Sequence, residues 1–366
     1  MKPLPTERIR RILAVKFKKI GDVVMTVPAL RAIRETYPEA YLAVLVNSGT
    51  EAVLEGLDWI DEVLVFDRRS KRGPLWQRAA RQLAFLKELR RRRFDLVIQM
   101  TKGDRGAIAA LLSGARLRAG VDPEGRGFPG KRFLFTHLAP SPHPQDHYVE
   151  YNLSIVRALG MKTSNLALEM PYGHEDVAAV DSFLAEAGVD GEVPLVHVHT
   201  TCSWIFKCWT VEGMARLIDH LQAGRGCAVA VTCGPADREK VLCAQILART
   251  NTSPVSFVGR TTLKQLAAIS ARATLFVSGD TAPMHIAAAV GTPVVAIFGP
   301  TGPLNTAPWG RGHRVITKGY ACQPCGQDGC GGSKRSDCLE DLTPEEVIPQ
   351  VDEALDRVLR HDRSLA

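Results

Sequence analysis

The chain has 366 residues, of which 45% are hydrophobic and 23% charged, and its formal net charge is +7. This length predicts two domains, and the composition is typical of a globular protein with sizeable cores. No apolar run reaches the ~18 residues of a membrane-spanning helix, and the start, MKPLPTERIRRILAV, lacks a hydrophobic signal region. We therefore expect a cytosolic protein.

Short apolar runs alternate with amphipathic segments along the first half of the chain. Strands are predicted at 12–17, 41–46, 62–66 and 95–99, and helices at 25–36, 50–57 and 74–93. Residues 122–147 are rich in Gly, Pro and His and are expected to form a long loop, and 160–176 is the expected linker. Strands that alternate with helices form parallel sheets covered by helices on both faces.

The second half repeats the pattern. Strands are predicted at 194–200, 227–233, 254–259, 274–279 and 293–299, and helices at 211–223, 236–249, 263–271, 284–290 and 344–360. We expect an α/β protein with two doubly wound domains, 1–172 and 173–342, and a C-terminal helix within 343–366 that packs back on them. Ligands in such folds bind at the carboxyl ends of the strands.

The positive charge is concentrated in residues 68–93, which hold eleven Lys and Arg against one acid, Glu88. This segment carries +10, which leaves about −3 for the rest of a chain whose total is +7. Two interpretations are open. The segment is a solvated helix face, or it creates a local field for an anionic partner such as phosphates, acidic sugars, nucleic acid or a membrane surface.

A carboxylate stands where the first strand gives way to a helix, in FKKIGDVVMTVPALRAI at 17–33. Asp22 can be an N-cap, or it can be a functional group at the carboxyl end of the strand. Gly21 beside it allows the close approach of a substrate.

A second turn of this kind lies in LFVSGDTAPMHIAAAVGTPVVAIFGPT, at 275–301. Gly279 permits a tight turn after the strand, and a helix is predicted to begin near Thr281. The free N–H groups and the positive dipole end of such a helix form a site for phosphate. Thr281 adds a hydroxyl group, and His285 can add a second donor for a diphosphate. An N-cap role alone would explain Asp280 but not His285.

Three motifs in this order resemble those of the ADP-heptose:lipopolysaccharide heptosyltransferases, glycosyltransferase family 9. They are IGDVVMTVPALRAI, HVHTTCSWIFKCW with its Lys-x-Trp at Lys207 and Trp209, and SGDTAPMHIAAAVGTPVVAIFGPT. The resemblance covers essentially the full chain. It implies a GT-B fold, in which two Rossmann-like domains face each other across a cleft, with the acceptor in the first domain and the nucleotide sugar in the second.

The resemblance also implies an inverting transfer of heptose from ADP-heptose to the inner core of lipopolysaccharide, with no bound metal or other cofactor required. Asp22 would be the general base, and Lys207 would balance the charge of the leaving diphosphate. Donor contacts are expected from Thr200, Thr201, Ser203, Asp280, Thr281, Ala282 and His285. Acceptor contacts are expected from Gly21, Arg68, Arg69, Lys71 and Arg72, because the family's acceptors are anionic glycolipids. The enzyme would act at the inner face of the cytoplasmic membrane.

The donor loop departs from the family pattern. Thr-Thr-Cys-Ser-Trp stands where Gly-Ser-Arg-Trp is usual, Cys208 stands where Arg is common, and Ala282 replaces a frequent Gly. A transferase or epimerase that uses another nucleotide sugar, with UDP or GDP, therefore stays open as the alternative. Asp237, after a predicted strand, is a candidate for the ribose hydroxyls or a helix cap.

Four of the nine cysteines form the pattern C-x2-C-x4-C-x7-C: Cys322, Cys325, Cys330 and Cys338. They can form a tetrahedral zinc site, or they can be free thiols in an ordered loop. A rival class is a nucleic-acid-binding protein, which predicts basic residues on several elements. Here the positive charge is confined to one segment, so we expect no nucleic-acid partner.

Overall fold

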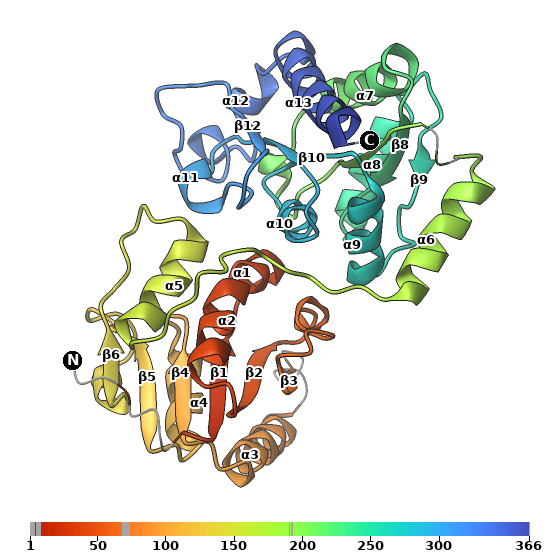
Figure 1. Ribbon diagram of the computed structural model, residues 1–366. Helices are drawn as coiled ribbons and strands as arrows, with labels where there is room; N and C mark the ends of the chain where they lie inside the picture. The colour runs from red at the N-terminus through yellow and green to blue at the C-terminus, as the bar shows by residue number, and fades with distance from the viewer. Residues whose placement is uncertain (1–3, 5–8, 68–73, 190, 192, 366) are drawn as a thin grey trace. The chain divides into compact units, whose positions relative to one another are not determined.

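The chain divides into two compact units, Met1–Ala167 and Leu168–Ala366. The computed structural model describes residues 4, 9–67, 74–189, 191 and 193–365. Each unit is built on one six-stranded parallel sheet (Figure 1). The described residues 161–173, where the division falls, form neither helix nor strand. The expected α/β fold with two doubly wound domains is confirmed.

The first sheet has the strand order β3-β2-β1-β4-β5-β6. Its strands are β1 (Arg11–Lys16), β2 (Tyr41–Asn47), β3 (Glu62–Phe66), β4 (Leu96–Gln99), β5 (Leu117–Val121) and β6 (His137–Ala139). The sequences of β1 and β2, RILAVK and YLAVLVN, are almost wholly buried. Near-continuous apolar runs of this kind are typical of central parallel strands, which have helices on both faces.

The helices of the first unit are α1 (Ile20–Val24), α2 (Val27–Thr36), α3 (Leu75–Arg91), α4 (Asp104–Leu112) and α5 (Tyr148–Ala158). Of these, α1, α4 and α5 were not predicted. The helix expected at 25–36 forms as α2, and Pro28 lies in its first turn, where a proline is tolerated. The helix expected at 50–57 is wrong, since only a 3-10 turn, Glu51–Val53, forms there. Gly56 follows with φ +97, which a helix cannot accommodate.

The second sheet has the order β12-β11-β10-β7-β8-β9, the same topology as the first sheet. Its strands are β7 (Leu195–His199), β8 (Ala228–Thr232), β9 (Val255–Ser256), β10 (Leu275–Gly279), β11 (Val294–Ile297) and β12 (Arg314–Ile316). Its helices are α6 (His174–Glu186), α7 (Val211–Asp219), α8 (Asp237–Leu247), α9 (Leu263–Arg272), α10 (Ala282–Ala289), α11 (Pro303–Thr306), α12 (Asp337–Glu340) and α13 (Pro344–Leu365).

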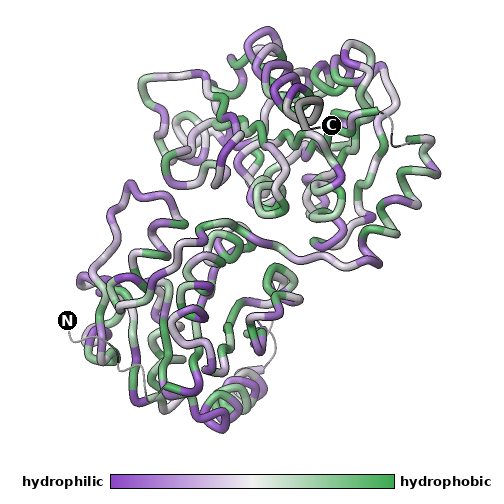
Figure 2. Tube along the Cα trace, in the orientation of Figure 1, coloured by the Kyte–Doolittle hydropathy of each residue, from purple (hydrophilic) through white to green (hydrophobic). Residues whose placement is uncertain are grey.

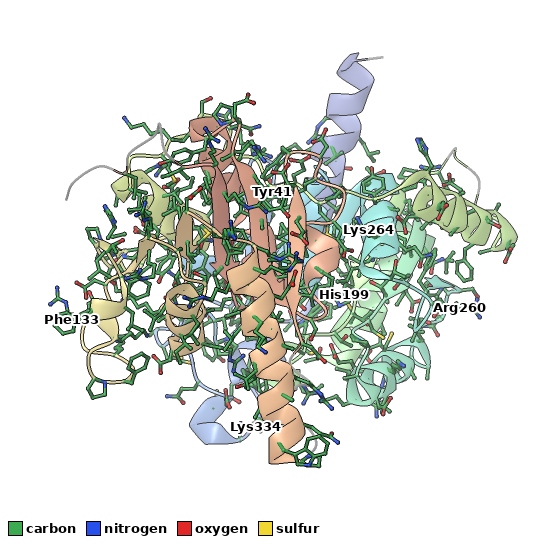
Figure 3. All side chains as sticks on the ribbon, turned by 90° about the horizontal axis from the view of Figure 1, so that it is seen from below. Tyr41, Phe133, His199, Arg260, Lys264 and Lys334 are labelled. Atoms are coloured by element: carbon green, nitrogen blue, oxygen red, sulfur yellow. The ribbon has the colours of Figure 1, made fainter. Side chains whose placement is uncertain are left out.

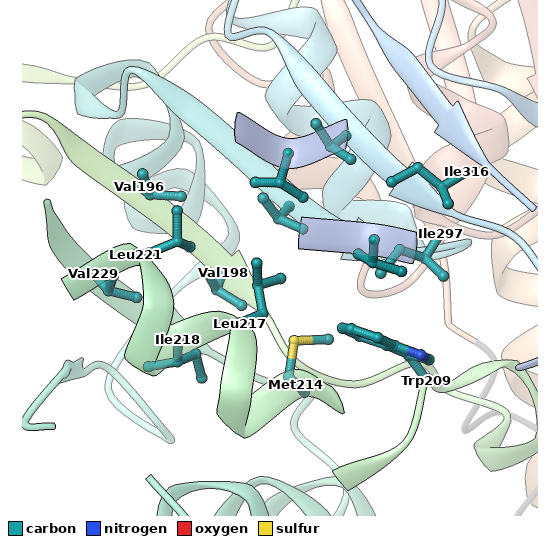
Figure 4. Packing of buried hydrophobic residues seen from close by; sticks show 14 of the residues in the cluster. Val196, Val198, Trp209, Met214, Leu217, Ile218, Leu221, Val229, Ile297 and Ile316 are labelled. Carbon is teal, nitrogen blue, oxygen red and sulfur yellow. The ribbon is translucent and has the colours of Figure 1, made fainter. Parts of the chain in front are cut away.

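A buried hydrophobic cluster joins the second sheet to α7 and α13 (Figure 4). Met214 and Leu217 of α7 belong to it together with Val347 and Val351 of α13. The Trp209 ring packs in the same cluster, and its Nε1 donates a hydrogen bond to the Leu342 carbonyl oxygen at 2.7 Å. The C-terminal helix therefore packs on the second unit.

Hydrophobic and hydrophilic residues are interleaved along α3 (Figure 2). This helix is anchored by Leu89, which is buried, and by Phe85, whose ring contacts Phe66 edge-on. Within the part of the chain that the structure describes, no helix is both long enough and apolar enough to cross a membrane.

Candidate active site

A pocket of about 790 Å³ lies at the carboxyl ends of β1, β2 and β4 in the first unit. Carboxyl ends of parallel strands are the usual ligand side of a doubly wound sheet. Four basic side chains, Lys18, Lys19, Lys102 and Arg105, line the pocket with two acids, Asp22 and Asp104. The pocket is therefore suited to an anionic ligand.

Asp22 lies in the first turn of α1 and on the wall of this pocket. It does not cap a helix, since the N-cap of α1 is Lys19 and that of α2 is Thr26. Its carbonyl oxygen accepts a hydrogen bond from Thr26 Oγ1 at 2.6 Å. Within the described residues its carboxylate makes no hydrogen bond or ion pair, which leaves it available to a ligand. Gly21, beside it, is buried.

Two ion pairs hold the loop that follows β4 against the rest of the first unit. Lys102 Nζ lies 2.7 Å from Glu124 Oε2, and Lys131 Nζ lies 2.8 Å from Asp104 Oδ1. Lys131 is buried and also donates a hydrogen bond to the Lys102 carbonyl oxygen. Lys102 and Arg105 were not predicted as site residues, although TKGDRG directly follows a strand. Their position after β4 is the same signal that pointed to Asp22 after β1.

The basic residues expected to bind the acceptor, Arg68, Arg69, Lys71 and Arg72, lie outside the described residues. Among the described residues, the pocket's cations are Lys18, Lys19 and Lys102, from the loops after β1 and β4, and Arg105, from the first turn of α4.

In the second unit the structure brings Lys207 and Asp280 together. Lys207 Nζ lies 2.7 Å from Asp280 Oδ2, with the two side chains only 20% and 10% exposed. Lys207 follows β7 and Asp280 follows β10, and these strands are neighbours in the sheet. Because the strands are parallel, their carboxyl ends meet at one edge. Asp280 is thus engaged by Lys207, and the N-cap of α10 is Thr281.

The start of α10 lies directly after Asp280. Thr281 has an extended backbone, φ −149 and ψ 163, and its side chain makes no capping hydrogen bond, so its hydroxyl can serve a ligand. Ala282 and His285 follow in the first turns, and His285 is buried. In the turn after β11, Thr301 Oγ1 is buried and finds no hydrogen-bond partner among the described residues. Thr301 was not predicted as a contact.

The loop after β7 contains three of the predicted donor contacts in different environments. Thr200 is buried, and its Oγ1 donates to the Thr232 carbonyl oxygen at 3.2 Å. Thr201 Oγ1 accepts a hydrogen bond from the Gly234 N–H at 3.0 Å, and it donates to Glu239 Oε1 at 3.4 Å. Ser203 is exposed.

Glu239 was not predicted as a site residue from the sequence. It is a buried carboxylate on α8, whereas the predicted Asp237 is exposed at the start of that helix. A buried acid near strand ends is the kind of group that binds ribose hydroxyls in nucleotide-binding folds. The only signal was its place in DREK, two residues after Asp237.

The four-cysteine segment packs behind the donor loop. Ser336 Oγ donates to the Phe206 carbonyl oxygen at 2.6 Å, and Leu339 lies so close to Gly299 that an added Cβ would fall 2.5 Å from it. Cys322, Cys325 and Cys330 are exposed and Cys338 is buried. No group of three or more His, Cys, Asp or Glu among the described residues is placed to hold a metal ion, so these thiols give no ready zinc site.

The chain is similar to known glycosyltransferases. Residues 82–334 match the family model described as glycosyltransferase family 9 (heptosyltransferase). Lipopolysaccharide heptosyltransferase 3 of Escherichia coli is 32% identical over 291 residues, which are 79% of this chain and 83% of that protein.

Two solved structures share the fold. The glycosyl transferase family 9 protein of Veillonella parvula DSM 2008 superposes with a TM-score of 0.82 at 21% identity, over 97% of this chain and 99% of that one. E. coli heptosyltransferase WaaC with ADP-2-deoxy-2-fluoro heptose gives 0.69 at 22% identity, over 94% and 99%. The two-sheet architecture is thus that of GT-B heptosyltransferases.

Proposed function

The chain belongs to glycosyltransferase family 9, the heptosyltransferase family, and on that basis we propose that this glycosyltransferase moves a heptose from ADP-heptose to the inner core of lipopolysaccharide. The relative named as a lipopolysaccharide heptosyltransferase supports the acceptor class, and the neighbour solved with an ADP-heptose analogue supports the donor. The nucleotide sugar is a substrate, and the proposal assigns no resident cofactor.

The observation that carries the proposal is the Asp22 carboxylate, which lies in a basic pocket and has no partner among the residues that the structure describes. As general base, Asp22 takes the proton of an acceptor hydroxyl while that oxygen forms its bond to C1 of the heptose. The bond between C1 and the diphosphate oxygen breaks, and ADP leaves as an anion. Attack from the face opposite the leaving group inverts the configuration at C1.

The second unit supplies groups for the leaving diphosphate. Lys207 gives a positive charge, and the N-terminus of α10 gives backbone N–H donors next to the Thr281 hydroxyl. Asp280 holds the Lys207 ammonium in place and can also accept hydrogen bonds from sugar hydroxyls. Glu239 is the proposed partner of the ribose hydroxyls.

Calorimetry with ADP, UDP and GDP, without added metal, tests the donor class first. Tighter binding of ADP than of UDP and GDP supports the proposal, and a preference for UDP or GDP points to the alternative nucleotide-sugar enzyme. Transfer is then measured with ADP-heptose and a lipopolysaccharide acceptor that lacks the heptose, and mass spectrometry reads the added residue. ADP binding without transfer to this acceptor would remove the inner-core assignment.

We also propose peripheral association with the inner face of the cytoplasmic membrane, through α3 and the segments beside it. Trp76 and Leu83 of α3 are 70% and 58% exposed, and Phe133 is 81% exposed and protrudes from its unit (Figure 3). Phe133 lies apart from α3, whereas exposed basic residues lie on α3 and at the start of α4: Arg81, Lys87, Arg90, Arg91 and Arg105. Aromatic and aliphatic side chains among cations suit an anionic lipid surface, where the acceptor resides.

A further inference from the structure

The last residue of β1, Lys16, is a lysine that is only 4% exposed. Its Nζ donates a hydrogen bond to Asn152 Oδ1 of α5 at 2.6 Å. No carboxylate lies within ion-pair distance of it among the described residues. A buried charge without a paired acid is costly to a fold, and a strand residue that only had to pack would be apolar. Lys16 therefore calls for a role beyond packing.

Asn152 connects Lys16 to the helix that carries Asp22. Its Nδ2 donates to the Met25 carbonyl oxygen at 2.9 Å, and Met25 is the C-cap of α1. Helix α1 has only five residues, and its N-cap makes no side-chain hydrogen bond. The chain of hydrogen bonds from Lys16 through Asn152 to Met25 thus ties this short helix to β1 and α5.

The charge of Lys16 also acts on Asp22. Burial lowers the pKa of Lys16 to about 8, and the negative charge of Asp22 opposes this shift. The two opposite charges attract each other, which helps to hold α1 toward β1. Lys16 is still protonated at neutral pH, when the base must be an anion.

We infer that Lys16 is a positioning residue for Asp22, because its buried ammonium ties down α1, the helix that carries this carboxylate, through Asn152. The inference rests on the proposed role of Asp22. It assigns a function to a residue pair that lies behind the pocket wall rather than in the pocket lining.

Other charges face Asp22 as well. Lys18 and Lys19 precede it in the chain, and Lys102, Asp104 and Arg105 line the same pocket. Lys102 and Asp104 are neutralised by their ion pairs. On the elements packed around α1, Glu51 accepts a hydrogen bond from the Gly49 N–H, and Glu150 of α5 pairs with Arg157. Lys131 is also a buried cation, but Asp104 pairs with it, whereas Lys16 makes no ion pair among the described residues.

The test is hydrogen exchange of the α1 backbone amides in the full chain, followed by NMR. In Lys16→Met we expect the Val23 and Met25 amides to exchange about tenfold faster, because α1 loses its tie to β1. Asn152→Asp should speed this exchange too, because a carboxylate cannot donate a hydrogen bond to the Met25 carbonyl oxygen. Lys162→Met, the same change at an exposed lysine of the first unit, should leave the exchange rates unchanged.

Transfer kinetics give the second readout. In Lys16→Met we expect kcat to fall by about tenfold or more and the affinity for ADP to stay unchanged. Lys16→Arg, which keeps the positive charge, should recover part of the rate. A role in stability alone would leave kcat unchanged in the molecules that stay folded.

The two proposals fail in different ways. If Lys16→Met and Asn152→Asp fold but leave the exchange of the α1 amides unchanged, the inference about Lys16 is wrong, whatever sugar the enzyme transfers. If the native chain transfers no heptose, the proposed function fails, while amide exchange still decides whether Lys16 positions α1. Should Lys16→Met not fold, Asn152→Asp and Lys16→Arg carry the same test.

Discussion

The two acidic residues that match the family motifs are held in opposite ways. Asp280 is 10% exposed and paired with Lys207, whereas the Asp22 carboxylate has no partner within the described residues. A general base must be able to accept a proton, and a group that balances a leaving phosphate must be fixed before the reaction. The difference in pairing therefore agrees with the different roles proposed for the two sites.

Asp22→Asn tests the base. The amide keeps the shape of the side chain but cannot take a proton, so we expect kcat to fall by about 10³-fold, within the range of general base catalysis. The affinity for ADP, measured by calorimetry, should not change. Asp58→Asn, at an exposed acid of the same unit, is the matched control. Near-native transfer by Asp22→Asn would assign the base elsewhere.

Lys207→Ala tests the diphosphate contact. Loss of a charge-assisted hydrogen bond should raise the Kd of ADP by about tenfold to a hundredfold. The loss of affinity should be smaller for adenosine, which has no phosphate. Lys240→Ala removes an exposed lysine from α8 and serves as the control. An unchanged Kd for ADP would mean that Lys207 pairs with Asp280 and does not contact the diphosphate.

At the scale of elements, the sequence predicted most strands, including the edge strand β3, and missed β5, β6 and β12. β1, β2 and β11 are nearly continuous apolar runs, so hydrophobicity alone marks them in the chain. The edge strand β6 has three residues and lies within the stretch expected to be a loop, and β5 contains Arg118 and Gly120. Such strands are specified by pairing with a neighbour, which local pattern does not reveal.

The sequence likewise identified some residues of the candidate site and missed others. Asp22, Lys207 and Asp280 lie in the segments that follow β1, β7 and β10 and belong to the family motifs, so chain order locates them. Lys16 and Asn152 are 136 residues apart, and only the packing of α5 beside β1 brings them into contact. Glu239 was missed because a charged residue in a helix pattern is normally expected to face solvent.

Strand β7 also carries a pH-dependent element, two buried histidines. Burial lowers the pKa of His199 to about 3 and, with the nearby His199, holds that of His197 well below its usual value (Figure 3). Thr232 Oγ1 lies 2.8 Å from a ring nitrogen of each. Both rings are therefore neutral in the folded protein at pH 5, whereas unfolded histidines take up protons below about pH 6.5.

Acid should consequently destabilise the second unit. The unfolded state binds more protons below about pH 6.5, so the free energy of unfolding falls by up to about 1.4 kcal/mol per pH unit for each histidine. Urea unfolding of the full chain at pH 7.5 and pH 5 measures this change. His199→Gln should reduce the pH dependence, and His174→Gln, at an exposed site, should not. Equal pH dependence in both variants would contradict the assignment.

At the scale of the whole molecule, the two units have the same strand order but different surface chemistry. The basic and apolar residues proposed to meet lipid, on α3 and α4, belong to the first unit, which also holds the Asp22 pocket. The ADP contacts are proposed in the second unit. One unit is thus assigned to the lipid-borne substrate and the other to the water-soluble substrate.

Vesicle sedimentation tests the lipid surface. We expect the full chain to bind vesicles that contain anionic phospholipid, more weakly as salt rises, because each basic residue near the surface contributes about 1 kcal/mol. Replacing Trp76 and Leu83 by serine should weaken binding, whereas Val241→Ser, at an exposed apolar residue of the second unit, should not. Equal binding to neutral vesicles, or no effect of the double substitution, would contradict the proposed surface.

The chain passes only once from one unit to the other, between Ala167 and Leu168. A single recombination in the gene at this point would therefore join an intact acceptor unit from one family member to an intact donor unit from another, without cutting either sheet. A lineage could in this way acquire a new activated sugar in one genetic event and still modify the same surface glycolipid. Because each unit is one continuous stretch of the chain, the unit proposed to bind the donor and the unit proposed to bind the acceptor can be inherited separately.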